Sequence, residues 1–225
     1  MPMGTLHPRL AQMLQERCFV LFVAVLALLV AVPFLSETTH GRVIANLFNL
    51  IVLVTAVAAV GRSMRSFVVA FLLALPVLAF QLLALQSGEA GFFALSWGFG
   101  AAFYTLTLAH LLRYVLRQDR LTADKLYGAV VAYLLIAILW AYLCGVLQYF
   151  YPGAYALEGT PKALDMGELI YFSFSVLTTS GFGDFTPILI QSRFLAMLEG
   201  VTGVMYVAIL IARLTGVYPI MERKP

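Results

Sequence analysis

The sequence predicts an all-α membrane protein with six transmembrane helices and one shorter helix that enters the membrane without crossing it. Three observations support this fold class: the composition, the number of long apolar segments and the shortness of one further segment. Hydrophobic residues make up 62% of the 225 positions and charged residues only 11%, about half the charged share of soluble domains. A soluble fold of this size would still need a polar surface. We therefore expect lipid around most of the chain.

The apolar segments have the lengths that membrane helices require. A helix needs roughly 20 mostly apolar residues to cross the hydrocarbon core, and its backbone polar groups must bond internally. The six segments of that length lie at about 18–35, 43–60, 67–86, 91–112, 126–150 and 189–212. A further apolar stretch at about 166–178 is too short to cross. Asp165 and Glu168 at its start match the pattern of a capping box, which predicts a helix that begins there.

Basic residues are distributed unevenly between the two sides of the predicted bundle. With the amino terminus in the cytoplasm, eleven basic residues lie inside and only Arg42, Lys162 and Arg193 lie outside, as the positive-inside rule requires. Both termini are then cytoplasmic, and we expect a multi-pass protein of the cell membrane. Acidic residues gather on the outer side, where they either concentrate cations or are simply solvated loop charges. They are Glu37, Glu89, Glu158, Asp165, Glu168 and Asp184.

The short apolar stretch leads directly into Ser180-Gly181-Phe182-Gly183-Asp184. Glycines at alternate positions permit backbone geometries that other residues avoid, so successive carbonyl groups can point to one side. Non-helical backbone at membrane depth persists only where it lines a cavity or is buried in protein. The preceding helix directs the negative end of its dipole to the same place. A dehydrated cation is the partner that such carbonyls need.

Residues Phe172–Asp184 resemble the pore signature of potassium channels, whose filter reads Thr-Val-Gly-Tyr-Gly. The resemblance implies a selectivity filter in which K⁺ is the permeant ion and no other cofactor is needed. It also implies that four chains, each with one pore loop, surround a common axis. The hydroxyl of Thr179 would contribute to the innermost site. The implied carbonyl ligands are those of Thr179, Ser180, Gly181 and Phe182.

The resemblance also assigns supporting roles around the filter. Gly183 would permit the outer turn, and Asp184 would anchor the filter's mouth from behind. Thr178 would help to end the pore helix, and Tyr171 with Phe172 would occupy the aromatic cuff position.

The filter departs from the family pattern at two positions. Phe182 replaces tyrosine, which only removes a hydroxyl group that would bond the aromatic cuff, whereas Ser180 replaces an aliphatic residue. We expect Ser180 to place a hydroxyl behind the filter near Ser175, where water softens the packing. Selectivity for potassium over sodium is therefore the expectation, with a non-selective monovalent cation channel on the same frame as the alternative.

The last predicted helix carries candidate gate residues. Gly203 lies twenty residues after Gly183, where the family's inner helices often bend, but small residues at Gly200 and Gly203 equally allow close helix packing in lipid. An apolar stripe on the same helix consists of Val204, Ala208 and Ile211. These side chains could gate the pore by dewetting, or they could simply pack between helices.

Two titratable residues are candidate modulators. Glu199 is a carboxylate within a span, where burial is costly and a functional role is the default hypothesis. It could be neutral, pair behind the filter with Ser173 or Thr178, or add negative field near the cavity. His110 could titrate near neutrality or serve as an interfacial anchor.

The sequence argues against a voltage sensor. The fourth predicted span, Phe92–Leu112, contains no Lys or Arg, so little charge would move in the membrane field.

These observations predict a passive potassium-selective homotetramer in the lipid bilayer rather than an enzyme or a nucleic-acid binder. A multi-pass transporter or enzyme is the less favoured class, because the three histidines are scattered and no second half repeats the broken-helix pattern. The net charge of +3 leaves no basic footprint for nucleic acid. The expected parts are a cytoplasmic amphipathic segment at 1–17, a four-helix peripheral domain at 18–120, a pore domain at 121–216 and a cytoplasmic tail at 217–225.

Overall fold

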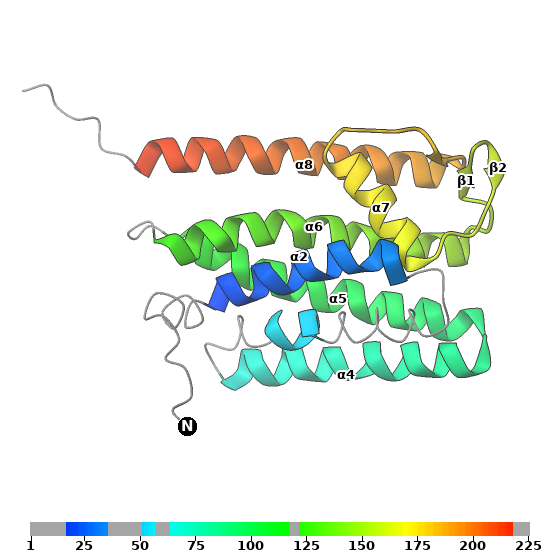
Figure 1. Ribbon diagram of the computed structural model, residues 1–225, viewed down its shortest axis with the longest axis horizontal. Helices are drawn as coiled ribbons and strands as arrows, with labels where there is room; N and C mark the ends of the chain where they lie inside the picture. Colours follow the sequence, from blue (N-terminus) through cyan, green and yellow to red (C-terminus); the bar gives the residue numbers. More distant parts are fainter. Residues whose placement is uncertain (1–16, 36–50, 57–63, 118–121, 218–225) are drawn as a thin grey trace, which may run out of the picture.

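The computed structural model describes residues 17–35, 51–56, 64–117 and 122–217 of the chain. The helices with defined bounds are α2 (Arg17–Leu35), α4 (Met64–Ser87), α5 (Ala90–Val115), α6 (Ala123–Phe150), α7 (Met166–Leu177) and α8 (Ile190–Val217). The loops between α6 and α7 and between α7 and α8 contain three short strands (Figure 1). These strands are β1 (Tyr155–Leu157), β2 (Thr160–Pro161) and β3 (Phe185–Pro187).

Four predicted membrane spans are confirmed as long apolar helices within the described residues. They are Val68–Ser87, Ala90–Val115, Ala123–Phe150 and Ile190–Arg213. Helix α2 coincides with the predicted span at 18–35. Of the predicted span at 43–60, the structure describes only residues 51–56, which are helical. The predicted terminal segments at 1–17 and 217–225 lie outside the described residues, except for Arg17 and Val217.

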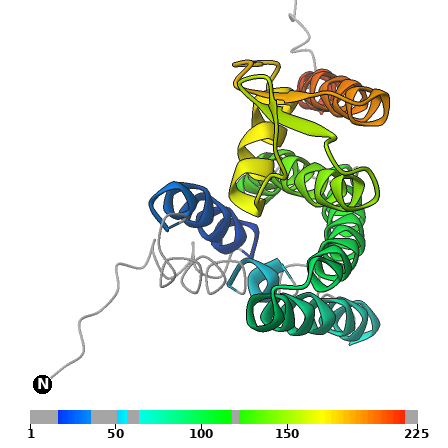
Figure 2. The same cartoon turned by 90° about the vertical axis from the view of Figure 1, so that its right-hand side faces the viewer.

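Helix α6 contacts helices on several sides. It packs against α5 and α2 on one side and against α7 and α8 on the other, and Figure 1 shows α8 separated from α5 and α4 by α6 and α7. The end view in Figure 2 shows α4, α5 and α6 following one another around a curve. Large apolar side chains such as Phe194, Met197 and Val201 remain exposed on α8. This is the pattern of a helix that faces lipid or other chains.

Close contact between α5 and α6 depends on small residues. A Cβ atom added at Gly100 would lie 2.2 Å from a ring carbon of Tyr142, and one at Gly145 would lie 2.8 Å from the Trp97 ring. Glycine at these positions lets the two helices approach closely, which is how helices in lipid commonly pack.

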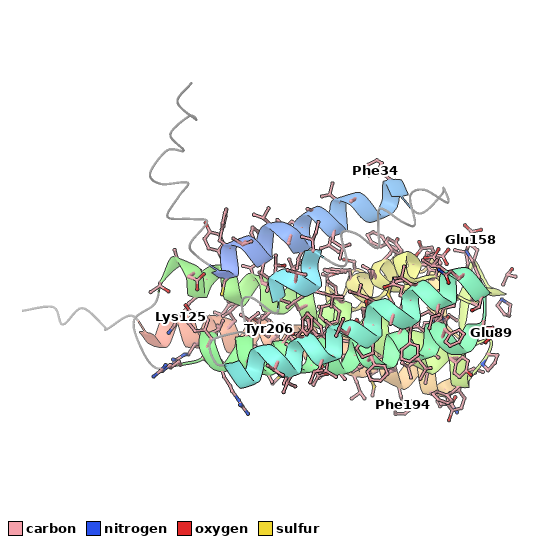
Figure 3. All side chains as sticks on the ribbon, turned by 90° about the horizontal axis from the view of Figure 1, so that it is seen from below. Phe34, Glu89, Lys125, Glu158, Phe194 and Tyr206 are labelled. Carbon is pink, nitrogen blue, oxygen red and sulfur yellow. The ribbon has the colours of Figure 1, made fainter. Side chains whose placement is uncertain are left out.

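Charged residues lie at both ends of the bundle. Figure 3 shows Lys125 at one end and both Glu89 and Glu158 at the other. At the Lys125 end, Asp124 accepts hydrogen bonds from the Cys18 backbone N–H at 2.9 Å and from the Tyr114 hydroxyl at 2.7 Å. Asp124 therefore joins the starts of α2 and α6 to the last turn of α5.

Candidate selectivity filter

Helix α7 begins at a capping box, which confirms the sequence prediction. Asp165 Oδ1 accepts a hydrogen bond from the Glu168 backbone N–H at 2.9 Å, and Glu168 Oε2 accepts one from the Asp165 N–H at 3.0 Å. These bonds satisfy donors that the first turn of a helix leaves free. Glu168 also forms an ion pair with Lys162. The start of α7 is thus fixed by residues that are close together in the sequence.

Helix α6 holds both ends of α7. The Gln148 side chain donates to the Leu164 carbonyl at 2.8 Å and accepts from the Leu164 N–H at 2.9 Å. At the other end, the Tyr133 hydroxyl donates to the Leu177 carbonyl at 3.3 Å. Figure 1 shows α7 lying obliquely between α6 and α8. Gln148 and Tyr133 could not be predicted as supporting residues, because their partners are backbone atoms of a distant segment.

The chain after α7 alternates between two backbone conformations. The φ angle is 58° at Thr179, 52° at Gly181 and 83° at Gly183, whereas Ser180 and Phe182 do not have positive φ. Glycine adopts positive φ readily, but a β-branched threonine there is strained. Such strain persists where surrounding structure enforces it and is frequent at functional sites. All five residues are exposed.

Three hydroxyl groups next to this segment have defined hydrogen-bond partners. Ser180 Oγ lies 2.9 Å from Thr178 Oγ1, which also donates to the Phe174 carbonyl at 2.7 Å. Ser175 Oγ instead donates to the Phe172 carbonyl. The Gly181 backbone N–H donates to the Ser175 carbonyl at 3.0 Å, so the loop lies next to Ser175. The Ser180 hydroxyl itself bonds Thr178 and not the Ser175 hydroxyl. Thr178 does end the helix, as predicted, because it is the C-cap residue of α7.

The aromatic residues around the segment fall into two groups. Tyr171 stacks on Phe182 with ring centroids 6.0 Å apart and contacts Phe185 edge-on at 5.6 Å. Phe172, in contrast, is buried against Tyr155 at 5.3 Å. Tyr171 thus contacts the candidate filter loop directly, and Phe172 anchors α7 to the outer loop.

A small antiparallel sheet fixes the residues after the filter. Its strand order is β2-β1-β3, and these strands are an addition to the predicted all-α fold. The Glu158 N–H donates to the Asp184 carbonyl at 2.8 Å, and the Asp184 carboxylate accepts from the Phe185 N–H. The Ser192 hydroxyl at the start of α8 donates to the Ala154 carbonyl at 2.7 Å. Asp184 is therefore held at the junction of residues 179–183 and the sheet.

Helix α8 crosses the end of α7 at a glycine. A Cβ atom at Gly203 would lie 2.2 Å from the Leu177 carbonyl oxygen, whereas one at Gly200 would lie 3.7 Å from the Val176 oxygen. Gly203 therefore permits this crossing, and its role as a bend stays a prediction. The predicted stripe of Val204, Ala208 and Ile211 is exposed on α8.

The two candidate modulators occupy different surroundings. Glu199 is fully buried on α8 beside Ser173. It does not pair with Thr178, whose hydroxyl bonds Phe174 and Ser180. His110 lies on α5, where its Nδ1 atom is 2.9 Å from the Leu106 carbonyl of the same helix. The structure thus brings Glu199, and not His110, next to α7.

Comparison with known proteins identifies the same part of the chain. A family model described as "Ion channel" matches residues 129–218, which run from within α6 past the end of α8. Searches of curated proteins and of solved structures gave no significant match. The matched region contains α7, the alternating segment and both flanking helices. This match confirms the resemblance to a channel pore, and residues 129–218 are similar in sequence to the ion channel family.

Proposed function

We propose that the chain forms a passive potassium-selective channel, with Thr179, Ser180, Gly181 and Phe182 as carbonyl ligands of K⁺. The alternation of φ along 179–183, directly after a short apolar helix, is the observation that carries this proposal. Such a backbone can present successive carbonyls to one side. The C-terminal end of α7 adds its negative dipole at the same place. Carbonyl oxygens can then replace the hydration shell of a K⁺ ion.

A single chain supplies only one strand of such a filter. Phe182 is 71% exposed, and Val201 and Val204 on α8 are each 55% exposed. Four chains around one axis would surround the ions with filter loops and cover part of this apolar face. With the positive-inside distribution of charge, both termini lie in the cytoplasm of a cell-membrane protein.

Purified protein is expected to migrate as a four-chain assembly and to release K⁺ from liposomes. Native mass measurement in detergent gives the number of chains, and a K⁺-sensitive dye gives the flux from vesicles that contain the same fraction. Because each chain carries one pore loop, smaller assemblies should not conduct. A conducting monomer or dimer would contradict the tetrameric filter.

Voltage dependence is expected to be weak. Within α5 the only Lys or Arg is Arg113, in the last turn, and moving one charge through the field is worth roughly 2.3 kcal/mol per 100 mV. The double substitution Arg113→Gln/Arg117→Gln should leave the slope of the conductance–voltage curve unchanged. It keeps the hydrogen bonds from Arg213 to the Leu116 and Arg117 carbonyls. A clear loss of steepness would identify α5 as a voltage sensor.

The alternative of a non-selective cation channel is favoured by one observation, the hydroxyl pair of Thr178 and Ser180. A polar pair behind the filter packs less firmly than valine and can admit water. Ser180→Val is therefore expected to raise the K⁺/Na⁺ permeability ratio or to lengthen openings, since Thr178 keeps its bond to the Phe174 carbonyl. Ser180→Thr, which keeps the hydroxyl, should resemble wild type. Single-channel recording of both variants distinguishes them, and equal behaviour would exclude a softening role for Ser180.

A further inference from the structure

Three helices and one strand bring polar side chains together in the protein interior, where α6, α7, α8 and β1 meet. Glu199 of α8, Ser173 of α7 and Cys144 of α6 are each 0% exposed, and Tyr155 of β1 is 1% exposed. Ser173 lies beside the Glu199 carboxyl group, and the Cys144 thiol lies beside both Tyr155 and Ser173. We call these four residues the Glu199 cluster.

Four oxygen atoms of the Glu199 cluster lie near other polar groups of the cluster, but none makes a hydrogen bond of good geometry among the described residues. Tyr155 Oη, Ser173 Oγ and both carboxyl oxygens of Glu199 are buried without a partner in the described chain. Buried polar atoms are nearly always paired, and each unpaired one destabilises the fold. Four such oxygens in one place therefore need hydrogen bonds from a small polar ligand or from one another.

The surroundings exclude most occupants. Among the described residues Glu199 has no ion pair, and an unpaired carboxylate in a dry interior is too costly to persist. The orphaned atoms are already inaccessible within one chain, so neither lipid nor a neighbouring subunit can reach them. The titratable groups that face Glu199 are Cys144 from α6 and Tyr155 from β1, while α7 contributes only the Ser173 hydroxyl.

We propose that the Glu199 cluster binds buried water and that Glu199 is held there as a neutral carboxylic acid. Carboxylic acid, phenol and alcohol groups can each donate and accept hydrogen bonds, and a buried water makes two to four of them. Burial raises the pKa of the Tyr155 phenol, which keeps it available as a donor. Water is a small ligand that can both donate hydrogen bonds to these oxygens and accept them.

This water site would join the inner helix to the pore helix. Glu199 directly precedes Gly200, which approaches the Val176 carbonyl, and lies one turn before Gly203, which approaches the Leu177 carbonyl. Glu199 is therefore a positioning residue that fixes α8 against the back of α7. The water site itself does not depend on the proposed channel function, whereas its effect on channel opening rests on it.

Infrared difference spectroscopy tests the site without any measurement of conduction. At neutral pH the wild type is expected to show the carbonyl stretch of a protonated carboxyl group, and Glu199→Gln should remove it. Glu158→Gln changes an exposed carboxylate and should leave that band in place. Exchange into H₂¹⁸O should shift a band of bound water that Glu199→Leu loses. If the wild type lacks the carboxyl band, or no water band depends on Glu199, the proposal is wrong.

Single-channel recording then measures the positioning role. Glu199→Gln keeps a polar group for the water and should hold mean open time within about twofold of wild type. Glu199→Leu leaves Ser173 and Tyr155 without a bridge and should shorten it about fivefold, the effect of losing roughly one hydrogen bond. Tyr155→Phe should also shorten the mean open time. This variant tests the positioning role if Glu199→Leu does not assemble. Wild-type open times in both Glu199→Leu and Tyr155→Phe would overturn the positioning role, while the infrared result would still decide the water site.

Discussion

Replacing Gly203 with alanine is expected to prevent formation of a stable conducting channel. The new Cβ would lie 2.2 Å from the carbonyl oxygen of Leu177 and 3.0 Å from its carbonyl carbon. These are backbone atoms, so relief of the clash must shift α8 or the end of α7, and the filter begins two residues later. Overpacking of this kind costs about 1–3 kcal/mol at a single site, and in the proposed tetramer it occurs four times. Thermal unfolding in detergent and single-channel recording measure the effect.

Gly200→Ala is the matched control. A Cβ at Gly200 would lie 3.7 Å from the nearest atom, the Val176 oxygen, and alanine favours a helix by roughly 1 kcal/mol over glycine. This variant should unfold at the wild-type temperature or above and should conduct. If Gly203→Ala is as stable as Gly200→Ala but alters gating, then Gly203 serves as a bend and the close crossing with α7 is wrong.

Gly183→Ala is expected to abolish conduction. Gly183 has φ 83°, and among the described residues of one chain no atom lies within 4 Å of its added Cβ, so within that chain the effect of alanine is backbone strain. The left-handed conformation costs a non-glycine residue about 1–2 kcal/mol, and four copies around one filter sum to about 4–8 kcal/mol. Relaxation of that strain would turn the carbonyls beside it. Single-channel recording of the reconstituted variant measures the loss.

Gly159→Ala tests whether strain alone causes this loss. Gly159 has φ 82° and equally open surroundings, but it lies in the turn between β1 and β2. It should therefore lose similar stability for each chain and still conduct. If Gly183→Ala conducts as well as Gly159→Ala, the geometry of residue 183 does not govern permeation.

Local signals in the sequence predicted much of the architecture. Long apolar runs predicted α4, α5, α6 and α8 to within a few residues, because lipid forces such runs into helices. The start of α7 was predicted from Asp165 and Glu168, whose capping bonds join residues three positions apart. Gly181 and Gly183 likewise predicted where the chain adopts positive φ, whereas no glycine signalled the positive φ of Thr179.

Contacts between distant segments could not be predicted in the same way. Strands β1, β2 and β3 have only two or three residues each, which is too short for an alternating pattern. The pairing of Ser180 with Thr178 depends on the turn after α7, and the Glu199 cluster combines residues from four separate elements. The sequence alone favoured neither close helix packing nor a helix bend at Gly203. The short distance from its added Cβ to the Leu177 carbonyl oxygen shows the packing contact.

The reversal potential under bi-ionic conditions tests the central claim most directly. Reconstituted wild-type channels would be recorded with K⁺ on one side of the bilayer and Na⁺ on the other. Because carbonyls of Thr179 to Phe182 replace the hydration shell of K⁺ in the proposed filter, we expect a reversal potential displaced far toward that of K⁺. Thr179→Ala should reduce this displacement, since it removes the hydroxyl at the innermost site. A wild-type reversal potential of zero would mean equal permeability to both ions and would contradict a potassium-selective channel.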